Sequence, residues 1–370
     1  MKVCFYSPTP SPLDILSGKT TERGGAEKQI AHLMTALADS GHQVYLLYGG
    51  VTNQPYPTLV EGVHGRRLNL TTWKRPGAVV TLWQQLNQIQ PDLIYTRLPD
   101  DFLWIVGLFA RLRAKTKFVY ALANDAHCNP WRAYAYHPWF HNTLYALGLS
   151  TAHVVLIQHE GQRRLVPSYM AGKLMRLPNL MQSLVERSRD YHAADFDAIW
   201  VAQVRPKKQL AVFLDVVERL PRLRFALVGG FNDSVDEATQ TALKERIHAL
   251  PNLTYLGLQK PSDAMRLLAR SKVLLNTSSD EGFPNTMLEA WSLGVPVVSL
   301  TVDPGDVIQR NALGFVSGNL AQLCADVERL VHSFALNHKL GTNGMDYVQK
   351  NHSLEVVMAA FELLLNGRSV

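Results

Sequence analysis

The sequence has few cysteines and no long apolar run. Its three cysteines, Cys4, Cys128 and Cys324, lie far apart and form no Cys-x-x-Cys pair. This pattern argues against a disulfide framework or a structural zinc site, and it fits a reducing cytoplasm. The longest uninterrupted apolar run, residues 102–110, is too short to span a bilayer, and residues 1–12 lack the pattern of a signal peptide. We therefore expect a cytoplasmic protein.

The sequence also lacks the fingerprint of a dinucleotide-binding enzyme, because no predicted strand leads into a Gly-x-Gly-x-x-Gly turn. A dehydrogenase is therefore disfavoured. Disorder is excluded as well, since 47% hydrophobic and 18% charged residues are typical of a folded globular chain. With 370 residues the chain is too long for one ordinary core, so we expect two domains.

The sequence does contain a regular alternation of apolar strand-like runs with helical patterns. Near-continuous runs of Val, Leu and Ile between helices indicate parallel sheets covered on both faces. The predicted strands are residues 2–6, 42–48, 92–96, 118–122 and 153–157, then 198–204, 224–228, 253–258, 272–276 and 295–300. The predicted helices are residues 26–40, 78–88, 101–112 and 138–147, then 209–220, 237–250, 262–270, 284–293 and 354–365.

This alternation predicts an α/β protein with two facing, doubly wound Rossmann-like domains and a ligand cleft between them. The first domain comprises residues 1–180 and the second residues 198–353. The charged stretch 181–197 has no clean period and is the expected linker. Residues 354–370 carry a last helix, whose docking position the sequence leaves open.

Positive charge is concentrated in the first half of the chain. Residues 1–180 hold 18 Lys and Arg against 10 Asp and Glu, a formal charge of +8, whereas the remainder carries −2. The basic residues, among them Arg111, Arg113 and Arg163-Arg164, fit either solvated helix ends or a peripheral contact with anionic lipids at the inner face of a membrane. Nucleic acid is not expected as a partner, because no groove-reading or base-stacking motif accompanies the charge.

The most informative segment is SSDEGFPNTMLEAW, residues 278–291, which follows a predicted strand. It therefore lies at the carboxyl end of a parallel sheet, where ligands bind in open α/β folds. Pro284 is expected among the first residues of a helix, so Glu281 lies in the loop and Glu289 in the second turn. N–H groups at a helix start favour an anion, while carboxylates accept hydrogen bonds from hydroxyl groups. The alternative is a capping role for Glu281 and a surface position for Glu289.

Two further segments carry candidate ligand groups. Arg205 and Lys208 follow the predicted strand 198–204 at the same edge, where cations neutralise a diphosphate as its charge develops. Gly24-Gly25 opens the first helix of the first domain, and paired glycines before a helix let the backbone approach a phosphate. Both segments also have simpler interpretations. Arg205 and Lys208 fit solvated loop cations, and Gly24-Gly25 fits an ordinary helix start with Glu27 as a capping acid.

Together these segments resemble family 4 of the retaining glycosyltransferases, which have the GT-B fold. The Glu-x7-Glu pattern in EGFPNTMLEAW, followed by SLGVPVV, is similar to the donor-site signature of that family. The resemblance implies that Glu289 holds the ribose hydroxyls of a nucleotide-sugar and that Glu281 contacts the hydroxyls of the transferred sugar. It also implies donor contacts from the loop and helix start between them, formed by Gly282, Phe283, Pro284, Asn285 and Thr286.

The same resemblance assigns roles to the cations and glycines. Lys208 matches a phosphate-binding Lys of the family, whereas the usual Arg position holds Gln203, so Arg205 is the candidate for that role. Gly24 and Gly25 match a Gly-Gly-x-Glu loop that closes over the donor diphosphate. On the acceptor side, many family members present a His near the reacting carbon. His127 and Asp125 are the candidates here, and a structural role for His127 stays open.

No metal ion and no other cofactor is expected. His127, His137 and His141 lack the pairing and carboxylates of a metal site, since Pro138 directly follows His137. We also expect no Asp-x-Asp motif of metal-dependent sugar transfer. Basic side chains and helix amides are predicted to serve instead of a metal ion.

These features predict a retaining, metal-independent, hexosyltransferase-like glycosyltransferase. The expected reaction moves a sugar from a nucleotide-diphosphate sugar to a saccharide or lipid-linked saccharide, in bacterial surface polysaccharide or glycolipid assembly. Three alternatives stay open: a non-catalytic nucleotide-sugar-binding subunit, a sugar-nucleotide epimerase of similar fold, and a phosphorylase with a pyridoxal cofactor.

Overall fold

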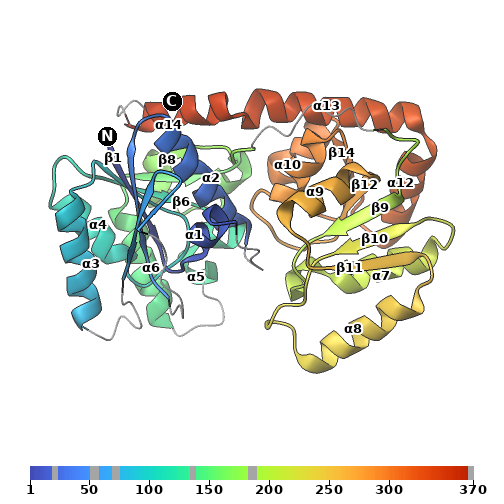
Figure 1. Ribbon diagram of the computed structural model, residues 1–370, viewed down its shortest axis with the longest axis horizontal. Coiled ribbons are helices and arrows are strands. Elements are labelled where there is room, and N and C mark those ends of the chain that lie inside the picture. The colour runs from blue at the N-terminus through green and yellow to red at the C-terminus, as the bar shows by residue number, and fades with distance from the viewer. Residues whose placement is uncertain (19–23, 51–57, 69–75, 134–138, 182–189, 366–370) are drawn as a thin grey trace. The chain divides into compact units, whose positions relative to one another are not determined.

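The computed structural model describes the whole chain except residues 19–23, 51–57, 69–75, 134–138, 182–189 and 366–370 (Figure 1). The chain forms two compact units. The first comprises Met1–Leu180 together with the C-terminal segment from Leu354, and the second comprises Met181–Ser353. Each unit is an α/β domain built on one sheet of largely parallel strands, which confirms the predicted fold class.

The first domain contains an eight-stranded sheet with the order β3-β4-β2-β1-β5-β6-β7-β8. Neighbouring strands are parallel, except that β3 and β4 are antiparallel. The strands are β1 (Lys2–Ser7), β2 (Gln43–Tyr48), β3 (Leu59–Val60), β4 (Val63–Arg67), β5 (Leu93–Thr96), β6 (Lys117–Ala121), β7 (Val154–Ile157) and β8 (Leu174–Arg176). The sequence did not predict β3, β4 or β8, because these strands are short or only partly apolar.

Helices cover both faces of this sheet. Alternate residues of β1 point to opposite faces, so Cys4 and Tyr6 join one hydrophobic cluster while Val3 and Phe5 join the other. Helices α3, α4 and α6 pack on the first face, and α1, α2 and α14 on the second. The helices are α1 (Ser11–Leu16), α2 (Gly25–Asp39), α3 (Pro76–Ile89), α4 (Leu103–Arg111), α5 (Pro130–Ala133), α6 (Trp139–Thr151) and α14 (Leu354–Leu365), with short 3-10 turns η1 (Asp125–Cys128), η2 (Glu160–Arg164) and η3 (Ser168–Lys173).

The last helix, α14, belongs to the first domain, which answers the question that the sequence left open. Its buried Phe361 ring lies 6.4 Å from the Tyr95 ring, centroid to centroid. Lys117 Nζ donates hydrogen bonds to the main-chain oxygens of Leu364 and Leu365 at the end of the helix. A cation at this position also interacts favourably with the negative end of the helix dipole.

The second domain contains a six-stranded, fully parallel sheet with the order β11-β10-β9-β12-β13-β14. Its strands are β9 (Phe196–Val201), β10 (Phe225–Val228), β11 (Leu253–Gly257), β12 (Ser271–Asn276), β13 (Val297–Ser299) and β14 (Gly314–Val316). Its helices are α7 (Leu210–Arg219), α8 (Glu237–Ala249), α9 (Pro261–Ala269), α10 (Asn285–Ser292), α11 (Val307–Arg310), α12 (Leu320–His332) and α13 (Phe334–His352), with 3-10 turns η4 (Pro206–Lys208) and η5 (Pro304–Asp306). Strand β9 begins two residues before the predicted strand, at the end of the stretch expected to be linker.

Each sheet has one point at which the direction of winding reverses. In the first domain the chain continues from β1 to β2 on one side and later adds β5 on the other, so the reversal lies between β1 and β5. In the second domain it lies between β9 and β12. Open α/β sheets bind ligands beyond the carboxyl ends of the strands at such points. The segments that follow these four strands are therefore the first candidates for functional groups.

Candidate functional site

Two loops meet at the reversal point of the second sheet. One follows β9 and contains η4; the other, residues 277–284, follows β12. The Ser279 N–H donates to the Lys207 carbonyl oxygen at 2.9 Å, and Thr277 Oγ1 donates to the Lys208 carbonyl oxygen at 2.8 Å. Thr277 Oγ1 in turn accepts from Trp200 Nε1 at 3.0 Å. These bonds join the two loops into one unit and fix the position of Lys208.

Lys208 and Glu281 form an ion pair across this junction. Their side chains are only 18% and 11% exposed, so the pair is largely shielded from water but still accessible. The sequence predicted both residues as site residues, and the structure brings them together. The adjacent Lys207 is half-buried, and burial lowers its pKa, against the opposing effect of the Glu281 carboxylate. The site therefore concentrates cations while keeping a carboxylate within reach of a polar ligand.

Arg205 lies in the same loop and is held by Gln203. The Oε1 atom of Gln203 accepts from Arg205 Nε at 2.9 Å and from Nη2 at 2.5 Å. The family resemblance expects an Arg at position 203. Gln203 stands there instead, and it orients Arg205, the residue proposed to take over the role of that Arg. Both residues are half-buried.

Helix α10 carries the second predicted carboxylate. The helix begins at Asn285, and Pro284 is its N-cap rather than its first helical residue as predicted. Glu289 lies in the second turn and is buried, with 9% exposure, which excludes a surface position. The first N–H groups of a helix point out of its N-terminal end, so those of Asn285 and Thr286 are directed toward the loop that carries Glu281.

The remaining predicted residues of this loop have structural surroundings. The Phe283 ring packs edge-on against Trp291 at 6.3 Å and lies 5.0 Å from the His352 ring. Gly282 and Pro284 are also buried. The Phe283 ring therefore anchors the loop in the core of the second domain.

The predicted glycine loop lies in the first domain. Gly24 is the N-cap of α2 and is half-buried, whereas Gly25 is exposed. A side chain at Gly24 would approach Glu27 Oε2 to 2.9 Å, which shows that the Glu27 carboxylate folds back over this residue. Glu22 and Arg23, which precede the glycines, lie outside the described residues.

On the acceptor side, the structure connects Asp125 with residues that the sequence did not reveal. Asp125 Oδ1 accepts a hydrogen bond from Gln162 Nε2 at 3.0 Å and lies 3.1 Å from His159 Nε2. The main-chain oxygen of His127 accepts from Tyr145 Oη at 2.9 Å. His159 follows β7 at the carboxyl edge of the first sheet. Its place just after a predicted strand was the sequence feature from which a site position could have been inferred. Asp125 and His159, rather than Asp125 and His127, therefore form the contact at this edge.

Asp100 lies at the reversal point of the first sheet. Its Oδ1 atom accepts from Tyr6 Oη at 2.8 Å and from the Phe102 N–H at 2.7 Å. Burial raises the pKa of Asp100 to about 6, although both hydrogen bonds oppose this shift. This carboxyl group therefore titrates closer to neutral pH than an ordinary Asp.

Of the three histidines that were not expected to form a metal site, His141 contacts a carboxylate. His141 Nδ1 lies 2.7 Å from Asp101 Oδ1, while His137 lies outside the described residues. Among the side chains that the structure describes, no group of three or more His, Cys, Asp and Glu is arranged for a metal ion. Within the same ranges, every helix falls short of the length or apolar character that a membrane crossing requires.

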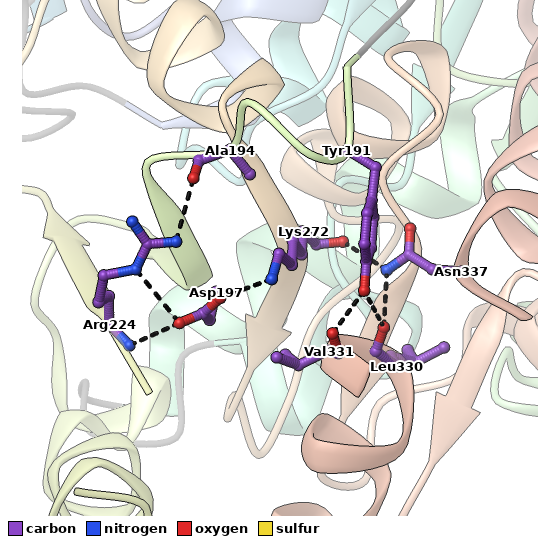
Figure 2. A network of polar contacts seen from close by, with 8 residues as sticks. All are labelled: Tyr191, Ala194, Asp197, Arg224, Lys272, Leu330, Val331 and Asn337. Atoms are coloured by element: carbon purple, nitrogen blue, oxygen red, sulfur yellow. Dashed lines mark hydrogen bonds and ion pairs between the residues drawn. The ribbon is translucent and has the colours of Figure 1, made fainter. Parts of the chain in front are cut away.

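One Asp-x-Asp sequence does occur, at Asp195 and Asp197, contrary to the expectation above. It lies at the amino end of β9, opposite the edge with the Lys208–Glu281 pair. Asp197 pairs with Lys272 at 2.9 Å and accepts from the Arg224 N–H, as Figure 2 shows. Although burial opposes it, these contacts lower the pKa of Asp197. Asp195 pairs with Arg270. Both carboxylates thus stabilise the sheet end rather than line the candidate site.

Comparisons with known families agree with this architecture. Residues 24–179 match the family model described as a glycosyl transferase 4-like domain, and residues 195–333 match the model for glycosyl transferases group 1. The two models together cover most of the chain. Each domain thus matches a family of glycosyltransferase domains, and the fold is that of GT-B glycosyltransferase structures.

Individual relatives are distant. The capsular polysaccharide biosynthesis glycosyltransferase CapM of Staphylococcus aureus is 23% identical over 159 residues, which cover 42% of this chain and 40% of CapM. The chain spans about 40–60% of the length of the curated relatives that it matches first. Among solved structures, sucrose-phosphate synthase from Thermosynechococcus elongatus has a TM-score of 0.80 at 16% identity and covers 99% of this chain and 98% of its own. Anabaena HepE in complex with UDP has a TM-score of 0.76 at 17% identity and covers 98% and 99%.

Proposed function

We propose that this chain transfers a sugar from a nucleotide-diphosphate sugar to an acceptor hydroxyl, and that the donor binds at the carboxyl edge of the second sheet. The observation that carries the proposal is the Lys208–Glu281 pair at the reversal point of that sheet, next to Arg205 and the start of α10. Cations for a diphosphate and a carboxylate for sugar hydroxyls are thus held by one pair of joined loops. The structural neighbour HepE binds UDP, and we extend that class of ligand to this chain.

In the proposed reaction, the bond between the anomeric carbon and the diphosphate oxygen breaks. Lys208, Arg205 and the first-turn N–H groups of α10 stabilise the negative charge that develops on the leaving diphosphate. Glu281 accepts hydrogen bonds from the transferred sugar, and Glu289 accepts them from the ribose. The acceptor hydroxyl oxygen forms the new bond and releases its proton.

Three finer features complete the proposal, and only the first is taken from the resemblance to family 4. We propose that the anomeric configuration is retained, that no metal ion is needed, and that Asp125 with His159 orients the acceptor or the transferred sugar. Lys208 and Arg205 supply the positive charge that a metal ion provides in other sugar transferases. A product of inverted configuration in an NMR time course, or activity that is lost on chelation, would contradict the first two features.

The proposed acceptor is a saccharide or lipid-linked saccharide in surface polysaccharide or glycolipid assembly. The similarity to CapM, a capsular polysaccharide glycosyltransferase, supports this class. The surface of the first domain supports an anionic membrane as a further partner, because residues 102–180 contain nine Lys and Arg but two Asp and Glu. Each basic residue near an anionic bilayer contributes about 1 kcal/mol to binding.

The proposed membrane contact is formed by α4 and α6, which pack against each other on one face of the first sheet. Helix α6 contains no Asp, Glu, Lys or Arg, and its Trp139 is 73% exposed; Leu112, directly after α4, is 67% exposed. Arg111 and Lys173 donate to main-chain oxygens at the end of α6.

In liposome flotation we expect binding to anionic but not neutral vesicles and a loss of binding in Trp139→Ser. Phe334→Ser, a change at an exposed aromatic of the second domain, is the matched control. Equal binding to neutral vesicles would contradict the contact.

The donor site is tested by thermal-shift measurement with UDP-sugars, GDP-sugars and other nucleotide-sugars, without added metal. We expect one donor class to stabilise the wild type, because a ligand at about 100 times its Kd adds about 2.7 kcal/mol to the free energy of unfolding. Glu289→Ala should lose this response, and Glu245→Ala, at an exposed position of α8, should keep it.

The same screen separates the alternatives. If no nucleotide-sugar stabilises the wild type, the donor site is wrongly assigned. Binding without turnover in crude acceptor extract favours the non-catalytic subunit. Conversion of the donor in the absence of an acceptor favours the epimerase, and a pyridoxal absorbance band favours the phosphorylase.

A further inference from the structure

Arg97 is a buried cation that forms no ion pair with the residues that the structure describes. It directly follows β5, at the reversal point of the first sheet, and is 5% exposed. Its Nη2 atom donates to Asn179 Oδ1 at 2.6 Å. Its Nε atom is buried and has no hydrogen-bond partner, and no carboxylate of the described residues forms an ion pair with it. A buried charge is normally paired, because its removal from water is costly.

Neutral amides surround this guanidinium at the carboxyl edge of the sheet. Asn179 Oδ1 also accepts from Gln158 Nε2 at 3.1 Å, and Gln158 directly follows β7. Gln162 continues the row to Asp125, whose carboxylate is in contact with His159 and Gln162 rather than with Arg97. The hydrogen-bonding side chains next to Arg97 are thus uncharged, and the carboxylates of this edge, Asp100 and Asp125, contact other groups. Open α/β sheets bind ligands at this position.

We propose that Arg97 binds an anionic oxygen group of a substrate, a phosphate or a carboxylate, at the carboxyl edge of the first sheet. A guanidinium binds such groups through two parallel N–H donors, and the Nε that lacks a partner completes one such pair with an Nη atom. The ligand then provides the countercharge that the protein does not. The inference rests on the proposed sugar transfer and adds a substrate feature to it. The anion is either the donor diphosphate or a charged group on the acceptor.

The test measures the melting temperature against inorganic phosphate at constant ionic strength, with chloride as the balancing anion. We expect the melting temperature of the wild type to rise saturably with phosphate, and the response of Arg97→Gln to be at least tenfold weaker. Arg97→Lys should respond to an intermediate degree, because Lys keeps the positive charge but lacks the paired N–H donors of a guanidinium. Arg66→Gln is the matched control, since Arg66 also donates to neutral amide oxygens, of Gln85 and Gln88, but near the surface. Its response should equal that of the wild type.

A second measurement excludes a merely structural role. Replacing a buried charge that has no charged partner leaves no orphaned counter-ion, so phosphate-free Arg97→Gln should melt no lower than Arg66→Gln. If Arg97→Gln does not fold, Arg97→Lys carries the test. The absence of a saturable response in the wild type, an equal response in the Arg97 variants, or a lower melting temperature with an intact phosphate response overturns the proposal.

Repeating the phosphate titration in the presence of UDP or GDP, whichever stabilises the wild type, identifies which substrate carries the anion. Loss of the phosphate response in saturating nucleotide assigns Arg97 to the donor diphosphate. A response that persists in saturating nucleotide and in Lys208→Met, but not in Arg97→Gln, assigns it to an anionic acceptor. If neither nucleotide binds while the Arg97-dependent phosphate response remains, the proposed donor site fails and the anion site stands.

Discussion

The carboxyl edges of the two sheets share a topology but differ in how their charges are arranged. At the edge of the second sheet, Lys208 and Glu281 form an ion pair between two joined loops. At the edge of the first sheet, Arg97 is buried and Asp100 is half-buried, and among the described residues each makes hydrogen bonds only to neutral groups. Lys208 and Glu281 are therefore paired with each other before a ligand arrives, whereas Arg97 and Asp100 are not paired.

This difference separates two ways in which a protein prepares a binding site. A partly exposed ion pair keeps each charged side chain in position at little cost and lets a polar ligand share the partners. Unpaired buried charges reduce the stability of the free protein, and such local costs are typical of functional positions. We infer that the site of the first domain costs the free protein more stability than the site of the second domain does. Substitutions at three positions test this comparison.

The largest effect is expected for Lys208→Met. This variant removes the cation nearest the developing diphosphate charge and leaves Glu281 without its ion-pair partner. Loss of one group that stabilises transition-state charge costs about 100- to 1,000-fold in rate. We therefore expect kcat/KM to fall by about that factor, measured with the donor identified by thermal shift. Lys244→Met, at an exposed position of α8, should leave activity unchanged. A decrease of less than about threefold in Lys208→Met would show that the pair serves only to join the loops.

A smaller effect, of opposite sign, is expected for Asp100→Asn at the first edge. Because burial raises the pKa of Asp100 from its ordinary 3.8 to about 6, the folded state binds this proton more tightly than the unfolded state. Stability is therefore lost as pH rises from about 4 to about 6 and stays lower above that range. Asn keeps the hydrogen bonds from Tyr6 and Phe102 but cannot ionise.

Asp100→Asn should accordingly raise the free energy of unfolding by about 2–3 kcal/mol above pH 7, and by almost nothing near pH 4. Urea unfolding of wild type and variant across this pH range measures the difference. Asp101→Asn is the control, since the neighbouring Asp101 is in contact with His141, a partner that carries charge when it is protonated. A variant that is less stable than the wild type at pH 7.5 would show that the two edges do not differ as inferred.

Much of the fold was predictable because buried parallel strands carry a strong sequence signal. The predicted strands 118–122 and 272–276 agree with β6 and β12 to within one residue at each end. The hairpin of β3 and β4 was missed because VHGRR, the sequence of β4, has little apolar character. Helices α12 and α13 were also missed, and the docking of α14 depends on distant contacts such as Phe361 with Tyr95, which no local pattern encodes.

The candidate site was predictable to the extent that it consists of a local motif. Glu281, Glu289 and Lys208 were found because each follows a buried strand within a recognisable segment. The contacts of Arg97 and His159 were not predictable, because they depend on side chains from other loops, 82 and 34 positions away in the chain. The donor contact predicted at Phe283 stays a prediction, while its ring packs against Trp291 and His352 in the core of the second domain.

The smallest effect is expected at Gln203, and it sharpens the comparison within the second edge. Gln203 orients Arg205 through a neutral oxygen, so Arg205 keeps its positive charge available. Gln203→Ala should raise the donor KM by about threefold, because a hydrogen bond of this kind is worth about 0.5–1.5 kcal/mol and Arg205 becomes less well oriented.

Gln203→Glu should raise the donor KM further, by about tenfold, because the new carboxylate has almost the same shape but neutralises Arg205 and repels the diphosphate. Steady-state kinetics at fixed acceptor concentration separates the two variants, and kcat should change by less than twofold in Gln203→Ala. An Arg205 that does not contact the donor predicts equal KM values for both variants and the wild type. A Gln203→Glu variant that binds donor as well as the wild type does would therefore remove Arg205 from the site and leave Lys208 as its principal cation.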